Sequence, residues 1–268
     1  MATQFLDTAR AFDAVAPEYD GALGNNLLIQ RMRACVIQKI VATFPRGARL
    51  LDLGCGTGID AIDLASRGYE IVAIDSSRGM VERTHTRAAS ARLETRLSAI
   101  HCSINELERL RPNEFDGMYS NLGPLNCVPD LRAASREMAR LLKPRGRIIA
   151  SVIGKYCPWE FIFYVLRFNF ARARVRLTNK SVPVPLQSEI VWTRYYSPRE
   201  FYRVFVDEFE LVSLRALNIF LPPPYLVHVY ARHQNFFAPI AFLEGRLSAA
   251  PLVRNLGDHF LIELQKRN

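Results

Sequence analysis

Two patterns of hydrophobic residues alternate over the first 153 positions. Five short apolar runs have the length and composition of buried strands. They cover residues 50–53, 70–75, 96–101, 114–120 and 147–153. Four longer stretches repeat apolar residues three and four positions apart, which is typical of helices with one buried face. They cover residues 25–44, 59–66, 79–91 and 131–142. This alternation predicts a parallel, doubly wound α/β sheet.

The pattern changes after residue 153. Aromatic and large aliphatic side chains crowd residues 159–170, basic residues follow, and two prolines interrupt residues 182–186. We expect this stretch to be an insertion in the series. Regular elements then return, beginning with a strand-like run and a helix that opens with Ser197 and Pro198. The later ranges are 190–196, 209–221 and 257–264 for strands and 239–247 for a further helix.

A glycine-rich turn joins the first predicted strand to the helix behind it. Gly54, Gly56 and Gly58 alternate with small residues, and glycine lets the backbone adopt positive φ and approach a ligand closely. A dinucleotide-binding turn needs another glycine where this chain has Ile59. Asp52, just before the turn, disfavours a pyrophosphate and favours a cationic ligand. The alternative is a corner whose glycines serve packing alone.

The stretch from Asp52 to Gly58 resembles motif I, E/D-x-G-x-G-x-G, of the class I S-adenosylmethionine (SAM) methyltransferases. Asp75 ends the second strand, and DSSRGM from Asp75 to Met80 is similar to the D-x-S-x-x-M of that family. The resemblance implies that Asp75 accepts hydrogen bonds from the ribose hydroxyls of SAM and that Met80 packs on adenine. A helix cap is the alternative role for an acid at this position.

The resemblance implies further SAM contacts from other segments. Tyr19 would close over the methionine end as part of a lid, although an ordinary surface aromatic is an equal alternative. Ser103 and Ile104 would border adenine, and Asn121 would lie beside the methyl group unless it is only a turn residue. The complete predicted cofactor set is Tyr19, Asp52, Gly54, Gly56, Gly58, Asp75, Ser76, Met80, Ser103, Ile104, Asn121 and Leu122.

The last strand–helix–strand series resembles the antiparallel hairpin that closes the class I sheet. The expected fold is therefore α/β, with a doubly wound, seven-stranded, mostly parallel sheet, an antiparallel last strand and an inserted cap that binds the acceptor. The expected divisions are lid helices at 1–45, the SAM-binding core at 46–153, the inserted cap at 154–200, and the C-terminal part of the core with a late helical insertion at 201–268.

Composition indicates the cellular location of the protein more clearly than its reaction. The five cysteines are scattered and contain no CxxC pair, so we expect neither a metal site nor a disulfide framework, and a reducing, cytoplasmic location fits. We read no signal peptide and no transmembrane run. The net charge of +9 permits contact with nucleic acid or an anionic membrane without establishing either.

The expected activity is methyl transfer from SAM to a small, fairly apolar or aromatic acceptor, at oxygen, nitrogen or carbon. The sequence NLGP after the fourth strand lacks the [DNS]-P-P-[YF] of enzymes that methylate base amines, so a nucleic-acid substrate is not favoured. Methylation of RNA or protein, a membrane-associated lipid methyltransferase and a non-enzymatic SAM-binding protein remain alternatives. An NAD-dependent oxidoreductase is the remotest one.

The catalytic base is the least defined part of the prediction. None of the five histidines stands in a recognisable catalytic spacing. His228 and Tyr225, after the triple proline, are the candidates for a catalytic role. The aromatic and basic residues after position 158 are expected to line the acceptor pocket, with a membrane surface or a simple packing role as alternatives. The oligomeric state is left open.

Overall fold

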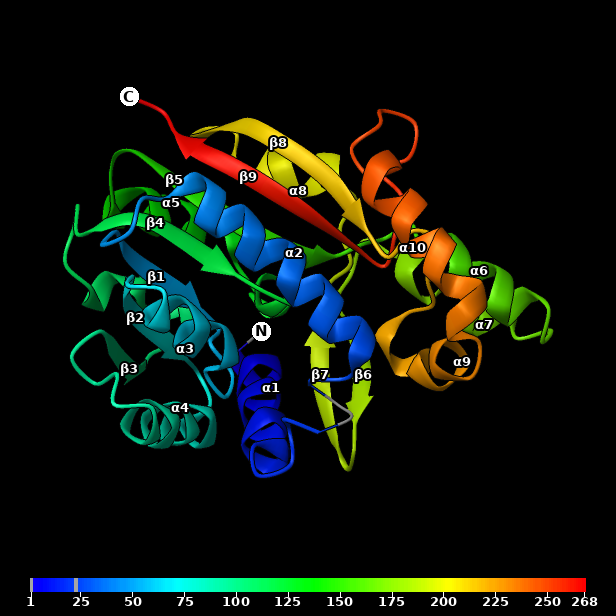
Figure 1. Cartoon of the computed structure of the whole chain (residues 1–268), viewed down its shortest axis with the longest axis horizontal. Helices are drawn as coiled ribbons and strands as arrows, with labels where there is room; N and C mark the ends of the chain where they lie inside the picture. Colours follow the sequence, from blue (N-terminus) through cyan, green and yellow to red (C-terminus); the bar gives the residue numbers. More distant parts are fainter. Residues whose placement is uncertain (1, 22–23) are drawn as a thin grey trace.

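The computed structural model describes residues 2–21 and 24–268, and its centre is a seven-stranded sheet (Figure 1). The strands follow the order β3 (Leu97–His101), β2 (Glu70–Asp75), β1 (Arg49–Leu53), β4 (Phe115–Ser120), β5 (Leu142–Ile153), β9 (His259–Lys266) and β8 (Phe209–Leu217). The first five strands in this order are parallel, whereas β9 runs antiparallel to both of its neighbours. The predicted α/β sheet with seven strands, mostly parallel and with an antiparallel last strand, is confirmed, whereas binding of the acceptor by an inserted cap stays a prediction.

Helices cover both faces of the sheet because its central strands are buried on both sides. One face packs against α2 (Leu27–Thr43), α3 (Ile59–Ser66) and α4 (Arg78–Ser90). The other face packs against α5 (Leu131–Leu141), α8 (Pro198–Phe205) and the 3-10 helix η1 (Ile104–Arg109). The helix α2 contributes Met32, Val36 and Ile40 to the first of these layers, so it is part of the sheet packing.

Side chains at the helix starts explain where these helices begin. Asn26, Ser77 and Asp130 each accept hydrogen bonds from backbone amides in the first turn of α2, α4 and α5. Ser197 and Glu200 form a reciprocal capping box at the start of α8, which confirms the predicted helix start.

A roof of distant segments covers the carboxyl ends of the parallel strands. It combines α1 (Ala2–Val15) with an antiparallel ribbon of β6 (Val182–Leu186) and β7 (Glu189–Thr193). The amide of Trp192 donates a hydrogen bond of 3.1 Å to the hydroxyl of Thr8. The predicted strand at 190–196 therefore ends at Thr193 and pairs outside the main sheet.

Apart from the short 3-10 helix η2 (Pro124–Cys127) after β4, the remaining helices gather at the end of the molecule beyond β8 and β9, far from α4 (Figure 1). They are α6 (Pro158–Val165), α7 (Phe170–Ala173), η3 (Val175–Leu177), η4 (Pro224–Leu226), α9 (Val227–Arg232) and α10 (Gln234–Leu247). Trp159 of α6 packs on a cluster that includes Phe237 and Ala241 of α10. We call segments 156–181 and 220–256 together the helical lobe.

Two buried glutamates fasten the lobe to the sheet. Glu160 of α6 binds Arg176, whose guanidinium also contacts Asp258 just before β9. Glu244 of α10 accepts hydrogen bonds from the amides of Asn218, Ile219 and Phe220. The second interaction explains why β8 ends at Leu217 rather than at the predicted Leu221, because those amides no longer face a neighbouring strand.

Candidate active site

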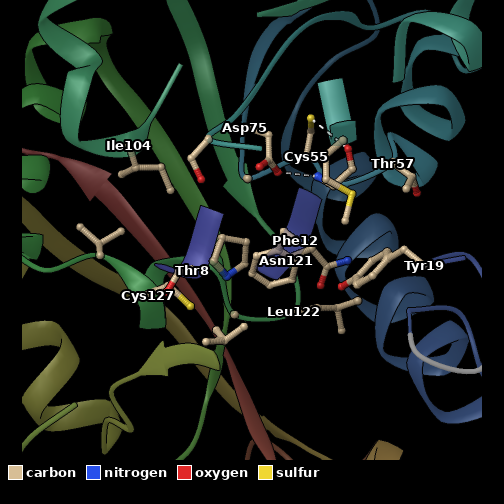
Figure 2. A pocket seen from close by; sticks show the side chains of 18 of the residues that line it. Thr8, Phe12, Tyr19, Cys55, Thr57, Asp75, Ile104, Asn121, Leu122 and Cys127 are labelled. Carbon is tan, nitrogen blue, oxygen red and sulfur yellow. Dashed lines mark hydrogen bonds between the residues drawn. The ribbon is translucent and has the colours of Figure 1, made fainter. Parts of the chain in front are cut away.

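A cavity opens at the carboxyl ends of β1, β2, β4 and β5, beneath the roof (Figure 2). This is the edge at which open α/β sheets bind their ligands. Its lining brings together segments from across the chain. They include Thr8, Phe12, Tyr19, Arg33, Gly54, Cys55, Gly56, Thr57, Asp60, Asp75, Ser76, Met80, Ile104, Asn121, Leu122, Cys127, Ile153, Val191 and Thr193.

The three glycines of the turn all have positive φ, but they differ in what surrounds them. A Cβ on Gly54 would lie 2.4 Å from Cβ of Pro124, and one on Gly58 would lie 2.8 Å from the side chain of Thr84. The nearest atom to a Cβ on Gly56 belongs to Tyr19, at 3.9 Å. Gly54 and Gly58 are therefore required by packing, whereas Gly56 leaves its backbone open toward the cavity.

Asp75 joins the end of β2 to this turn. One carboxylate oxygen accepts a hydrogen bond from the amide of Gly56, and the other accepts one from the amide of Ser77, each at 2.9 Å. Burial raises the pKa of Asp75, and these two amides counteract part of that rise. Each oxygen keeps an unused lone pair, so the carboxylate can accept further hydrogen bonds from a ligand in the cavity.

A second polar group contains residues that the sequence did not single out. One oxygen of Asp60 accepts hydrogen bonds from Arg33 at 2.7 Å and from the side-chain amide of Asn121 at 3.0 Å. The other guanidinium nitrogen of Arg33 donates to the carbonyl of Gly24. Arg33 resembles the exposed basic positions around it in the sequence, and only the fold shows that its side chain is 13% exposed.

The segment after α1 is held against the glycine turn and closes one side of the cavity. The hydroxyl of Thr57 and the guanidinium of Arg87 both donate to the carboxylate of Asp20. This places Tyr19 in the lining, where its ring meets that of Phe12 edge to face. Burial raises the pKa of Tyr19 above its ordinary value.

The other predicted cofactor residues divide into two sets. Ser76, Met80, Ile104 and Leu122 line the cavity. Asp52, Gly58 and Ser103 do not form part of its lining. The Ser103 hydroxyl instead accepts a hydrogen bond from the amide of Asn105 at the start of η1.

Asp52 is only 2% exposed on β1, where its register partner in β4 is Tyr119. Burial, with the charge of Asp60, raises the pKa of Asp52 well above its usual range. The Asp52 carboxyl is therefore buried within the sheet and does not face a ligand in the turn, contrary to the expectation from the sequence.

The two candidate catalytic residues lie in the helical lobe rather than in the cavity. The hydroxyl of Tyr225 donates a hydrogen bond of 2.7 Å to Glu160, and His228 is exposed on α9. Both are absent from the cavity lining, as are the other histidines of the described residues. The sequence could not place them because the triple proline before them defines a turn but not its direction.

The part of the cavity next to the roof is mostly apolar. Phe12, Ile153 and Val191 line it together with Cys127 and Thr193. Burial raises the pKa of the Cys127 thiol to about 12, so this group is neutral near pH 7. Among the described side chains in this part of the lining, none is therefore a ready general base, and the cavity's two carboxylates, Asp60 and Asp75, lie near the glycine turn instead.

Comparisons with known proteins agree with this geometry. Residues 50–146 match the family model described as a methyltransferase domain. The chain is 33% identical over 120 residues to the ubiquinone biosynthesis O-methyltransferase of Alkalilimnicola ehrlichii. The aligned region is 45% of this chain and 47% of that protein. It is 32% identical over 143 residues to the demethylmenaquinone methyltransferase of Clavibacter sepedonicus, covering 52% and 54%. The chain thus spans about half the length of these relatives.

Solved structures share the fold over nearly the whole chain. The Burkholderia thailandensis 1,6-didemethyltoxoflavin-N1-methyltransferase superposes with a TM-score of 0.61 at 15% identity, covering 98% of this chain and 88% of that one. The [4+2]-cyclase SpnF superposes with a TM-score of 0.65 at 16% identity, covering 96% and 95%. The second protein is named for a different reaction, so the fold alone does not define the chemistry. Together, these findings show that residues 50–146 form a methyltransferase domain and that the chain shares the Rossmann-like fold of these solved structures.

Proposed function

We propose that this protein transfers the methyl group of SAM to a small, fairly apolar molecule that ionises without help from an enzyme base. The observation that carries the proposal is the division of the cavity. One part combines the open backbone of Gly56 with the carboxylate of Asp75, and the part beneath the roof is apolar and contains no ready base.

The residues around the glycine turn fit the chemistry of SAM. Asp75 has free acceptor capacity for the two ribose hydroxyls, and Met80 and Ile104 supply apolar surface for a purine. Arg33 and Asp60 offer a cation and an anion to the carboxylate and ammonium groups of an amino acid. Tyr19 covers the same region from the segment after α1.

The reaction needs positioning more than acid–base catalysis. SAM supplies a methyl group that its sulfonium has already activated. The protein's share is to exclude water beneath the roof and to hold the acceptor in line with that methyl group. Since the pKa values of Cys127 and Tyr19 are raised, neither group removes a proton from the acceptor near pH 7.

An acceptor whose ionised form is accessible without an enzyme base suits such a site. A phenol, a carboxylic acid or a readily enolised carbon supplies its own nucleophile, whereas an aliphatic alcohol does not. The names of the curated relatives, for ubiquinone and demethylmenaquinone, support a phenolic or quinol-like acceptor. The apolar side chains of Phe12, Ile153 and Val191 suit the ring of such a molecule.

Calorimetry and a transfer assay test this proposal together. S-adenosylhomocysteine should bind the purified protein, and NADH should not. Labelled methyl groups from SAM should then appear on phenols or carboxylic acids of matched size, but not on aliphatic alcohols or transfer RNA. Binding of NADH without S-adenosylhomocysteine would overturn the assignment, and transfer to an alcohol alone would overturn the acceptor class.

A further inference from the structure

The outer surface of the helical lobe carries large apolar side chains that no other part of the described structure covers. Every exposed phenylalanine among the described side chains belongs to it. Leu166, Phe168 and Leu252 are 74%, 83% and 89% exposed. The exposed phenylalanines are Phe161, Phe168, Phe170, Phe220, Phe236 and Phe242. Exposed apolar side chains gathered in one region mark an interaction surface.

Phe168 illustrates how directly these side chains face outward. It follows α6 with φ of +56°, a left-handed conformation that glycine usually supplies at the end of a helix. Amides of this turn, those of Phe168 and Asn169, bond back to Val165 and Tyr164. A bulky residue in this position adds strain without adding any burial. Packing within the chain therefore does not explain the choice of phenylalanine.

All exposed charges on this surface are positive. The lobe contains two carboxylates, Glu160 and Glu244, and both are buried and bound inward to Arg176 or to backbone amides. The exposed basic side chains are Arg167, Arg172, Arg174, Lys180, Arg232 and Arg246. The surface therefore presents cations among aromatic rings with no exposed acid between them.

Several of these cations are held close to the rings. The guanidinium of Arg167 lies 3.6 Å from the ring centroid of Phe163, and that of Arg246 lies 4.7 Å from the ring of Phe242. Arginine stacked on an aromatic ring keeps its charge at the level of the apolar surface. Such a layer is complementary to a bilayer surface, where acyl chains accept the rings and anionic headgroups accept the cations.

We infer that the helical lobe docks this protein on a membrane surface that contains anionic lipids. Among the described residues, no helix combines the length and the apolar composition needed to cross a bilayer. The two buried glutamates make the docking face possible, because they fasten α6 and α10 to the sheet from the inside. This inference concerns a surface outside the cavity and does not depend on the acceptor.

Flotation of the full-length protein with vesicles tests the inference. We expect binding to phosphatidylcholine vesicles that contain phosphatidylglycerol, at least about tenfold weaker binding to pure phosphatidylcholine, and loss of binding in high salt. The double variant Leu166→Ser/Phe168→Ser should reduce binding about tenfold or more, because it removes two side chains that would enter the bilayer. Arg172→Glu/Arg174→Glu should reduce binding to the anionic vesicles by a similar factor.

Matched variants outside the lobe provide the controls. Leu211→Ser/Val212→Ser changes exposed apolar residues on β8, and Arg136→Glu/Arg199→Glu changes exposed arginines on α5 and α8. Neither control should alter flotation, and all four variants should bind S-adenosylhomocysteine as the parent protein does. Failure of the parent protein to float, or equal losses in the lobe and control variants, overturns the inference.

Sedimentation without lipid separates docking on a membrane from self-association. We expect the parent protein and Leu166→Ser/Phe168→Ser to have the same mass in solution. A dimer that dissociates in this variant would assign the surface to a second copy of the chain and overturn the inference. A parent protein that floats with the vesicles but does not bind S-adenosylhomocysteine would instead count against the proposed function.

Discussion

The sheet core and the helical lobe are built in different ways, although the chain enters the lobe twice. In the core, apolar side chains fill both faces of the sheet, and a backbone turn forms much of the cavity. In the lobe, short helices are fastened by buried charges while many of their rings face outward. The contrast indicates that buried polar attachments can supplement a small apolar interface, here the cluster of Leu28, Phe237 and Ala241, which leaves other apolar residues available for an external surface.

The largest expected effect comes from breaking the charged attachment of the lobe. Arg176→Met leaves Glu160 and Asp258 buried without their counter-charge, so we expect the free energy of unfolding to fall by about 3–5 kcal/mol. Urea unfolding measures this loss. Arg174→Met, an exposed neighbour, should change stability by less than about 0.5 kcal/mol. Equal stabilities of the two variants would mean that the lobe is held mainly by apolar packing.

The same attachment predicts a dependence of stability on pH. Although burial alone would raise it, the charge of Arg176 holds the pKa of Asp258 well below its ordinary value. Its contribution is therefore present at neutral pH and is lost as pH falls below about 4. Unfolding measured from neutral to acidic pH should show this loss in the parent protein. In Arg176→Met, stability should fall less steeply as the pH is lowered below about 4. The same acid dependence in this variant and in the parent protein would contradict the role of Arg176.

A smaller effect on the free energy of unfolding is expected for Gly54, the glycine of the turn that packs on Pro124. Gly54→Ala combines left-handed strain with a close approach to Pro124, whereas Gly47→Ala has similar φ and nothing within 4 Å. Gly47→Ala should lower the free energy of unfolding by about 1–2 kcal/mol. Gly54→Ala should lower it by about 1–3 kcal/mol more. Urea unfolding of both variants would show this difference. Equal losses would mean that Pro124 can move aside.

Gly56→Val completes this series because its side chain would enter the cavity. Its stability should be close to that of Gly47→Val, which places the same β-branched side chain at a left-handed position with nothing within 4 Å, while S-adenosylhomocysteine binding falls below detection in calorimetry. Binding retained at the parent level would show that the backbone of Gly56 does not approach the ligand. That result would remove the distinction between packing and binding glycines in the core.

Asp75→Asn should have a still smaller effect on cofactor binding, although it also removes the acceptor of one backbone amide, that of Gly56 or Ser77. We expect S-adenosylhomocysteine affinity to fall by about 1–3 kcal/mol, because the ribose hydroxyls lose a charged acceptor. Asp63→Asn changes a carboxylate on the outer side of α3 that pairs with Arg67, and it serves as the control. Calorimetry that gave the same affinity for both variants would count against contact between Asp75 and the ribose.

The smallest contribution of the protein is expected in the pH dependence of methyl transfer. With Cys127 and Tyr19 neutral near pH 7 and no histidine lining the described cavity, we expect the rate to follow ionisation of the acceptor. The midpoint of the pH–rate profile should therefore move with the pKa of each phenol in a series. A midpoint that stays near pH 6–7 for all of them would reveal a histidine base.

Local features of the chain account for the cavity residues that stand out in the sequence. Positive φ at a turn demands glycine, and an acid that ends a buried strand is placed by the strand itself. Gly54, Gly56 and Asp75 therefore stand out in the sequence alone. Arg33 and Asp60 do not, because an arginine on a helix looks exposed unless the position of its partner is known.

The sequence by itself determined the series of strands and helices up to residue 153, the glycine turn and the acids beside it, since each depends on neighbours a few residues away. Tertiary structure alone decided that Thr8 meets Trp192 above the cavity, that Tyr225 binds Glu160 instead of facing the acceptor, and that two distant segments form one cationic, apolar surface. These contacts join residues far apart in the chain. Their energies depend on burial and charge that exist only after the sheet has formed.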